Sequence, residues 1–133
     1  MLELDDVRAF CRGREVDLVM VSPPAPFTVC LHGEFDGYGD FFSLVARDVE
    51  YVDLPGGFPL GEMRDVSQVS AMVELSPKWT GLAELHSGPA VAFRSADARD
   101  WGTGCCDHLI IANHLEWRAG RDWKPMGRRA APG

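Results

Sequence analysis

The sequence predicts a mainly β protein of the α+β class, built as a single antiparallel β-sandwich or strongly curved sheet with one short N-terminal helix. Three observations predict it. Segments of alternating or β-branched apolar residues recur at hairpin-like spacing, clusters of glycine and proline separate them, and helical periodicity is confined to the N-terminus. At 133 residues, of which 46% are hydrophobic and 25% charged, the chain is long enough to bury the core of one domain.

The N-terminal helix is expected within residues 2–13, where apolar residues recur at helical spacing. Asp5 and Asp6 would lie near the positive end of its dipole. Two strands are expected next, at 16–22 and 27–32, and the prolines between them would end the first. In the second strand, "FTVCLH", the apolar positions that include Phe27 alternate with Thr28, Cys30 and His32.

A long strand is expected over residues 41–54, after a turn cluster. Phe42 and Ala46 share one face, whereas Val49 and Tyr51 have the opposite parity. A bulge or bend near Arg47–Asp48 would reconcile the two halves. The glycines and prolines of residues 55–59 would then end the strand.

The second half of the chain predicts three further strands. They are expected over residues 63–75, 89–97 and 107–118, with one helical turn within 76–88 and the glycine-rich "WGTG" before the last strand. Residues 1–117 are therefore expected to form a single β-rich domain. Residues 118–133 have no periodicity and are predicted to be a basic tail that is mobile or loosely docked.

Charge is distributed unevenly along the chain. The net charge is −7, but residues 118–133 carry five basic residues against one acidic residue, which leaves −11 on residues 1–117. An acidic body argues against non-specific nucleic-acid binding, which requires Lys and Arg to replace counterions along the phosphates. It is compatible with a basic protein partner, and also with no role beyond solubility.

The stretch "WGTGCCDHLIIANHLEW", residues 101–117, places two cysteines near two histidines. On a strand, His108 and His114 would lie roughly 20 Å apart, too far to share one ion. Two Cys-x-His pairs, Cys30 with His32 and Cys106 with His108, would instead each share a strand face. If their strands were adjacent, the four residues could bind zinc, whereas otherwise the cysteines are small hydrophobic residues and the histidines partly solvated.

Motifs for catalysis are absent from the sequence. It contains no nucleophile elbow, no P-loop and no dinucleotide fingerprint, and no catalytic residues are assigned. Cys105, after "GTG", is the thiol most expected to lie in a loop, and it would be the nucleophile of a thiol enzyme. The "DGYGD" segment with Asp36 and Asp40 lacks the oxygen ligands of a calcium loop and indicates a β-turn.

The location is predicted from the N-terminus and the cysteines. No secretory signal and no membrane span are expected, and the four cysteines are too few and too irregularly placed for a secreted disulfide framework. A cytoplasmic protein with reduced thiols, no cofactor and no membrane partner is therefore predicted.

The block "FFSLVARDVEYVDLP", which follows "FTVCLHGEFDG", resembles a strand pattern of small uncharacterised bacterial β-proteins. Some of these are similar to immunity proteins that neutralise toxins in polymorphic toxin systems. The resemblance covers about a fifth of the chain and implies no catalytic residues. The matching positions are Leu44, Val49, Tyr51, Asp53, Leu54 and Pro55, with Ala46 where the pattern prefers an aromatic residue.

Together these observations predict a non-catalytic binding protein, an immunity-type inhibitor that docks an acidic surface on a basic protein such as a toxin. Carboxylates that imitate phosphates would give fast, salt-sensitive association if that toxin were a nuclease. The alternatives are a small-molecule or metal-binding β domain and, third, a thiol-dependent enzyme or hydrolase. The partner-binding candidates are Asp36, Asp40, Asp48, Glu50 and Asp53, joined by Trp79 and Trp101 if those tryptophans are interface anchors rather than packing residues.

Overall fold

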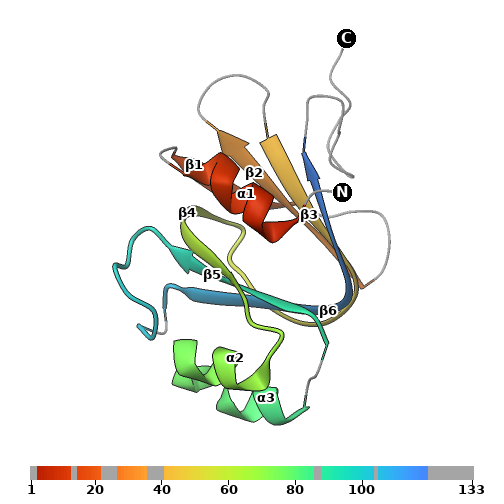
Figure 1. The fold of residues 1–133 in the computed structure, drawn as a ribbon, viewed down its shortest axis with the longest axis vertical. Helices are drawn as coiled ribbons and strands as arrows, with labels where there is room; N and C mark the ends of the chain where they lie inside the picture. The colour runs from red at the N-terminus through yellow and green to blue at the C-terminus, as the bar shows by residue number, and fades with distance from the viewer. Residues whose placement is uncertain are drawn as a thin grey trace.

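A computed structural model describes residues 3–12, 15–21, 27–35, 41–85, 88–103 and 105–119. Its strands form a closed antiparallel barrel in the order β1-β2-β3-β6-β5-β4 (Figure 1). The elements are α1 (Leu4–Cys11), β1 (Val16–Val21), β2 (Thr28–Phe35), β3 (Phe41–Asp53), β4 (Gly57–Asp65), α2 (Val69–Leu75), the 3-10 helix η1 (Pro77–Trp79), α3 (Thr80–Leu85), β5 (Ala90–Ser95) and β6 (Asp107–Ala119).

Closure of the barrel corrects the predicted sandwich or curved sheet. The start of β4 pairs with β1, with Leu18 opposite Phe58, and the rest of β4 pairs with β5. The glycines and prolines of residues 55–59 follow the end of β3, as expected, but β4 already begins at Gly57 and pairs first with β1 and then with β5. At Gly61, where the register with β5 shifts, an added Cβ would lie 2.9 Å from the carbonyl oxygen of Arg94. Glycine is therefore needed for the close approach of the two strands.

The strand predicted over residues 63–75 is the second correction. Residues 63–65 end β4, and residues 69–75 form helix α2 instead. The apolar residues of this segment fit both a two-residue and a helical repeat, and packing decides between them. Met72 is buried against the outer face of the barrel, whereas Glu74 is exposed. The helical turn expected after it is present as η1 and α3.

Two hydrophobic clusters support the fold. The first fills the barrel and includes Leu18, Leu44 and Phe93. The second lies between the outer face of β5 and β6 and the helical segment α2–η1–α3, and it includes Leu109 and Trp79. Each strand of the β5–β6 pair is therefore buried on both faces, which explains its nearly continuous apolar sequence.

The long strands β3 and β6 both change parity near the middle. In β3, Ala46 and Val49 both pack against the barrel core although three positions separate them. Asp48 lies between them with a φ of 53°, and the register with β6 shifts between Val49 and Tyr51. The predicted bend near Arg47–Asp48 is therefore present. Tyr51 contacts the outer cluster whereas Val49 packs against the barrel core, so these two residues lie on opposite faces of β3.

The same change corrects the expected faces of β6. The sequence predicted Leu109 and Leu115 on one face of a regular strand. In the structure, Leu109 packs beneath α2 in the outer cluster, and Leu115 packs against the barrel core. The strand also continues through Arg118 to Ala119, so the first two residues of the predicted tail belong to β6, and residues 120–133 lie outside the described residues.

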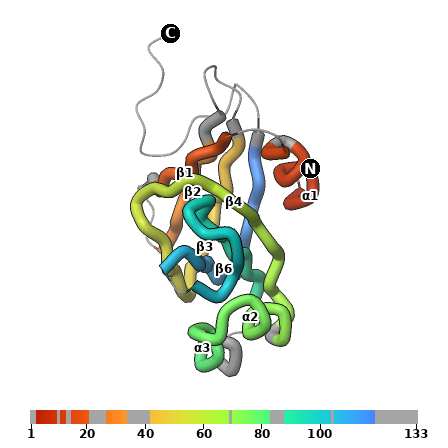
Figure 2. The backbone as a smooth tube through the Cα atoms, turned by 90° about the vertical axis from the view of Figure 1, so that its left-hand side faces the viewer, coloured from red at the N-terminus to blue at the C-terminus, as the bar shows by residue number. Residues whose placement is uncertain are grey.

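Helix α1, as predicted, begins the described fold. The backbone N–H of Glu3 donates to the Asp6 carboxylate at 2.9 Å and so stabilises the first turn. Leu4 and Val7 pack against the barrel core beside Trp117. The helix lies next to the upper part of β6, where β5 does not reach (Figure 2).

Candidate protein-docking site at the bend of β3

Two residues with strained backbone conformations lie at the bend of β3, Asp48 within the bend and Phe27 just before β2. Phe27 and Asp48 are the described non-glycine residues with positive φ, at 52° and 53°. The carbonyl oxygen of Phe27 accepts the backbone N–H of Val49 at 2.9 Å, which joins the start of β2 to the bend. A left-handed conformation costs an ordinary L-residue roughly 1–2 kcal/mol, although aspartate tolerates it better than phenylalanine. Strain of this kind is concentrated at functional sites.

Phe27 presents its ring to solvent at this position. The residue is 77% exposed, although sequence alternation placed it inside with Val29 and Leu31. Val29 and Leu31 do pack against the barrel core. The positive φ of Phe27 turns its side chain away from them, at a point just after the proline-rich segment. Val52, on the same strand as Asp48, is the other large apolar residue that is exposed among the described residues, at 41%.

Acidic side chains surround the bend. Asp48 and Glu50 are exposed, and the Asp48 carboxylate lies 3.9 Å from Nε2 of His114. Asp53 is half-buried and forms an ion pair with Lys78 at 3.1 Å. Of the five predicted acidic contacts, Asp48 and Glu50 are therefore exposed at the bend, whereas Asp53 is half-buried in its ion pair. Asp36 and Asp40 lie outside the described residues.

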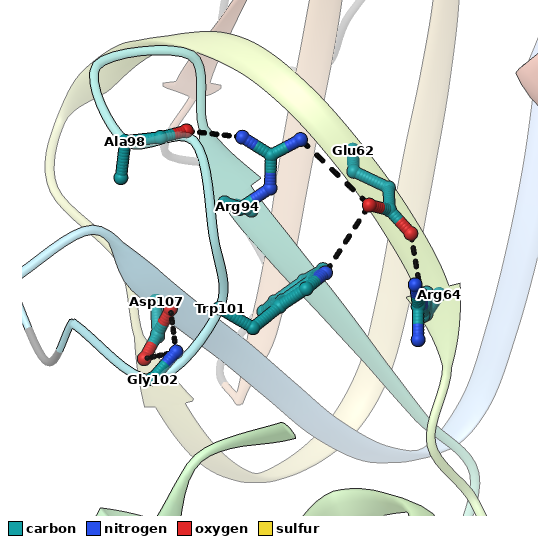
Figure 3. A network of polar contacts seen from close by, with 7 residues as sticks. All are labelled: Glu62, Arg64, Arg94, Ala98, Trp101, Gly102 and Asp107. Carbon is teal, nitrogen blue, oxygen red and sulfur yellow. Dashed lines mark hydrogen bonds and ion pairs between the residues drawn. The ribbon is translucent and has the colours of Figure 1, made fainter.

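The two tryptophans predicted as possible interface anchors are both packed against other residues of the chain. Trp79 is 1% exposed within the outer cluster, which corrects its assignment as an interface residue. Trp101 is half-buried, and its indole N–H donates to Glu62 at 3.2 Å (Figure 3). Its ring is also contacted by the Arg64 guanidinium, 5.9 Å from the ring centre. Both side chains therefore pack within the protein rather than project into solvent.

The network around Trp101 holds the loop between β5 and β6. Glu62 accepts from Arg64 and Trp101 and lies 3.7 Å from Arg94, whose guanidinium also donates to the carbonyl of Ala98 (Figure 3). Burial alone would raise the pKa of Glu62, but these hydrogen bonds and the two positive charges outweigh it and lower the pKa. We assign this cluster a structural role, because the Glu62 carboxylate is bonded to donors of the cluster itself, although the buried Nε of Arg94 has no hydrogen-bond partner among the described residues.

The two Cys-x-His pairs do not meet. Strand β3 lies between β2 and β6 in this part of the barrel, and Cys30 is opposite Val45, which in turn is opposite Glu116. His108 lies eight positions from Glu116 along β6, beyond the register shift opposite Val49 and Tyr51, so the two pairs lie in different parts of the barrel. Within the described ranges, no three cysteine, histidine or acidic side chains gather as metal ligands.

Each pair has its own local environment. Burial raises the pKa of the Cys30 thiol to about 11, and His32 Nδ1 lies 3.3 Å from the hydroxyl of Ser43. His108 packs its ring against Phe58, with 4.6 Å between centroids, and burial lowers its pKa. Buried neutral groups of this kind are typical of packing residues.

Cys105, the candidate thiol nucleophile, is exposed in the loop before β6. Its sulfur lies 3.5 Å from that of Cys106. The contact raises the pKa of the Cys106 thiol, which lowers its thiolate fraction at neutral pH. No described histidine is placed against either sulfur as a general base.

Sequence reasoning missed an ion cluster on the outer face of β3 and β6. Glu116 accepts from Arg47 at 3.0 Å and from Arg118 at 2.8 Å. These hydrogen bonds lower the pKa of Glu116 to about 2. The spacing of Glu116 and Arg118, two residues apart on one strand face, was the available signal, but the partner strand of Arg47 was unknown.

Comparisons with known proteins found no matching family model, no matching curated protein and no matching solved structure. Among the described residues, no helix is long and apolar enough to cross a membrane.

Proposed function

We propose that this chain is a non-catalytic binding protein that docks the bend of β3 on a basic protein partner, in the manner of an immunity-type inhibitor. The observation that carries the proposal is Phe27, whose ring is 77% exposed on a backbone held at positive φ. An aromatic side chain in solvent at a strained position gives the isolated chain no packing energy. Such a residue is instead suited to anchor a partner.

The charges around Phe27 support a basic partner. Asp48 and Glu50 are exposed beside the bend, so an approaching cation would meet carboxylates around an apolar centre. Protein interfaces have this arrangement, with an aromatic or aliphatic anchor at the centre and polar groups at the rim. The −11 charge of residues 1–117 would also accelerate the encounter with a basic partner.

The resemblance of the β3 segment to immunity proteins agrees with this function. A nuclease toxin is one such partner, because its phosphate-binding residues would be attracted to carboxylates. We place the protein in the cytoplasm. Support comes from its four cysteines, which are all thiols and include the adjacent pair Cys105 and Cys106.

Photo-crosslinking tests the proposal in cells that naturally produce the chain. A benzophenone amino acid replaces Phe27 in one variant and Glu74, exposed on α2, in the matched control. We expect position 27 to capture one protein with a basic isoelectric point, and position 74 to capture little of it. Equal capture at both positions, an acidic captured protein, or no capture at position 27 would overturn the proposal.

A further inference from the structure

A groove of about 920 Å³ runs beside the C-terminal part of β6 and is lined there by residues 114–117. Strand β5 begins at Ala90, opposite Ile111, and just before it the Pro89 carbonyl accepts from Ala112 at 3.1 Å, with Gly88 beside Ala112 and Asn113. Beyond that point, the described strands pair with β6 only on the β3 side. No described strand pairs with residues 113–117 on the other side, which faces α1.

The groove follows the edge of the strand. Four consecutive residues, His114 to Trp117, line it, although side chains alternate between faces along a strand. Consecutive residues line one groove when it exposes the backbone edge rather than one face. A strand edge of this kind presents N–H and C=O groups to which another strand can add.

Two walls bound the groove. Residues 3–5 at the start of α1 form one wall, and Ser67 and Pro89 form part of another. Helix α1 stands beside this edge of β6 in Figure 2. We take one extended peptide as the occupant, because a single added strand would continue the pairing of β6 from the point where β5 begins.

Charge favours a basic peptide. Four carboxylates line the groove, at Glu3, Asp5, Asp65 and Glu116. Glu116 is already paired with Arg47 and Arg118, so the attraction for a basic peptide comes from the other three, of which Asp5 lies 3.9 Å from Arg8. The apolar side chains of Leu115 and Trp117 face the barrel core from the same segment. A strand that alternates basic with apolar residues would place its cations near the carboxylates and its apolar side chains on the side of Leu115 and Trp117.

We propose that residues 113–117 of β6 accept an extended basic segment of a partner protein as an added antiparallel strand, in line with β5. The inference rests on the proposed function, because it specifies a second contact with the basic partner. Binding would then combine backbone hydrogen bonds along β6 with the aromatic anchor at Phe27.

A synthetic peptide tests the strand addition directly. The probe is a seven-residue peptide that alternates lysine and valine, with blocked ends, added to the full chain. We expect amide shifts and slowed hydrogen exchange at residues 113–117 by NMR. Two further peptides carry N-methyl groups on all lysine or on all valine nitrogens, so each removes the donors of one peptide edge.

One N-methylated peptide is expected to bind at least about tenfold more weakly than the unmodified one, because several backbone hydrogen bonds are lost, and the other is expected to bind equally well. Equal binding of all three peptides would show attraction by charge alone and overturn the proposal. Concentration-dependent dimerisation that competes with the peptide would assign the edge to a second copy. Tighter peptide binding after removal of residues 120–133 would assign it to the chain's own C-terminus.

Paired neutralisations add a control. Asp5→Asn, in the groove wall, is expected to weaken the peptide by a few fold, whereas Glu74→Gln on α2 should leave it unchanged. The peptide experiment does not involve Phe27. Failure here with intact partner capture at position 27 would therefore reject only the strand addition, and the reverse result would reject only the docking site.

Discussion

Phe27 and Asp48 show how single residues determine the shape of the proposed docking site. Each adopts a conformation that L-residues rarely take, and a backbone hydrogen bond from Val49 to Phe27 joins them. Backbone strain is therefore present at these two neighbouring positions, and the same positions expose one aromatic ring and one carboxylate. Neither side chain is needed by the barrel core, so the strain is a local property that substitution can separate from stability.

Phe27→Gly tests that separation. Glycine relieves the ~1–2 kcal/mol of strain but adds ~0.5–1 kcal/mol of chain entropy to the unfolded state, so the free energy of unfolding should stay equal or rise slightly. Phe27→Ala, the matched control, loses the ring but keeps the strain and should be less stable than the glycine variant. Urea denaturation measures both. A loss of more than about 1.5 kcal/mol in Phe27→Gly would mean that the ring stabilises the fold.

At the scale of elements, Trp79 is the largest of the side chains that fix the helical segment α2–η1–α3 to the barrel. It is buried among Met72, Leu109 and Ile111, and its indole nitrogen has no hydrogen-bond partner among the described residues. Its contribution is therefore the volume of the ring rather than its polar group. This is the opposite of an interface anchor, which would leave the ring accessible.

Two substitutions of Trp79 distinguish these roles. Trp79→Ala should cost about 3–5 kcal/mol through the cavity it leaves beneath the helices. Trp79→Phe should cost only about 1–2 kcal/mol, because the lost N–H was unsatisfied and most of the ring volume remains. Urea denaturation provides both values. Equal costs for the two variants, or a cost below ~1 kcal/mol for alanine, would contradict the packing role.

The sequence predicts the local elements of this molecule better than its closure. Alternating residues identify most strands, and the parity change between Ala46 and Val49 predicts the bend. Closure depends on pairing between Leu18 and Phe58, forty positions apart, and no local pattern reports such a contact. Helix α2 was missed because its apolar spacing satisfies two periods at once.

The candidate site was predictable only in part, for similar physical reasons. Acidic residues at Asp48 and Glu50 are evident from composition, but the exposure of Phe27 is not. Alternation placed that ring on one strand face with Val29 and Leu31, and the positive φ of Phe27 accompanies its exposure instead. The described residues give the zinc hypothesis no support, because β3 lies between β2, which contains Cys30, and β6, which begins just after Cys106.

The central claim concerns the whole molecule: its acidic surface at the bend of β3 attracts and holds a basic protein. Association of the purified chain with the partner captured at position 27 can be followed by stopped-flow fluorescence at low and high salt. We predict a rate that falls by about tenfold or more as salt rises, because steering of opposite charges is screened.

Two charge reversals give the same net charge and make this measurement decisive. Asp48→Lys with Glu50→Lys should remove most of the salt dependence, whereas Glu74→Lys with Asp100→Lys, at exposed positions away from the bend, should leave the rate within about twofold of the original. An association rate that is the same at low and high salt, or that both reversals slow equally, would contradict the account.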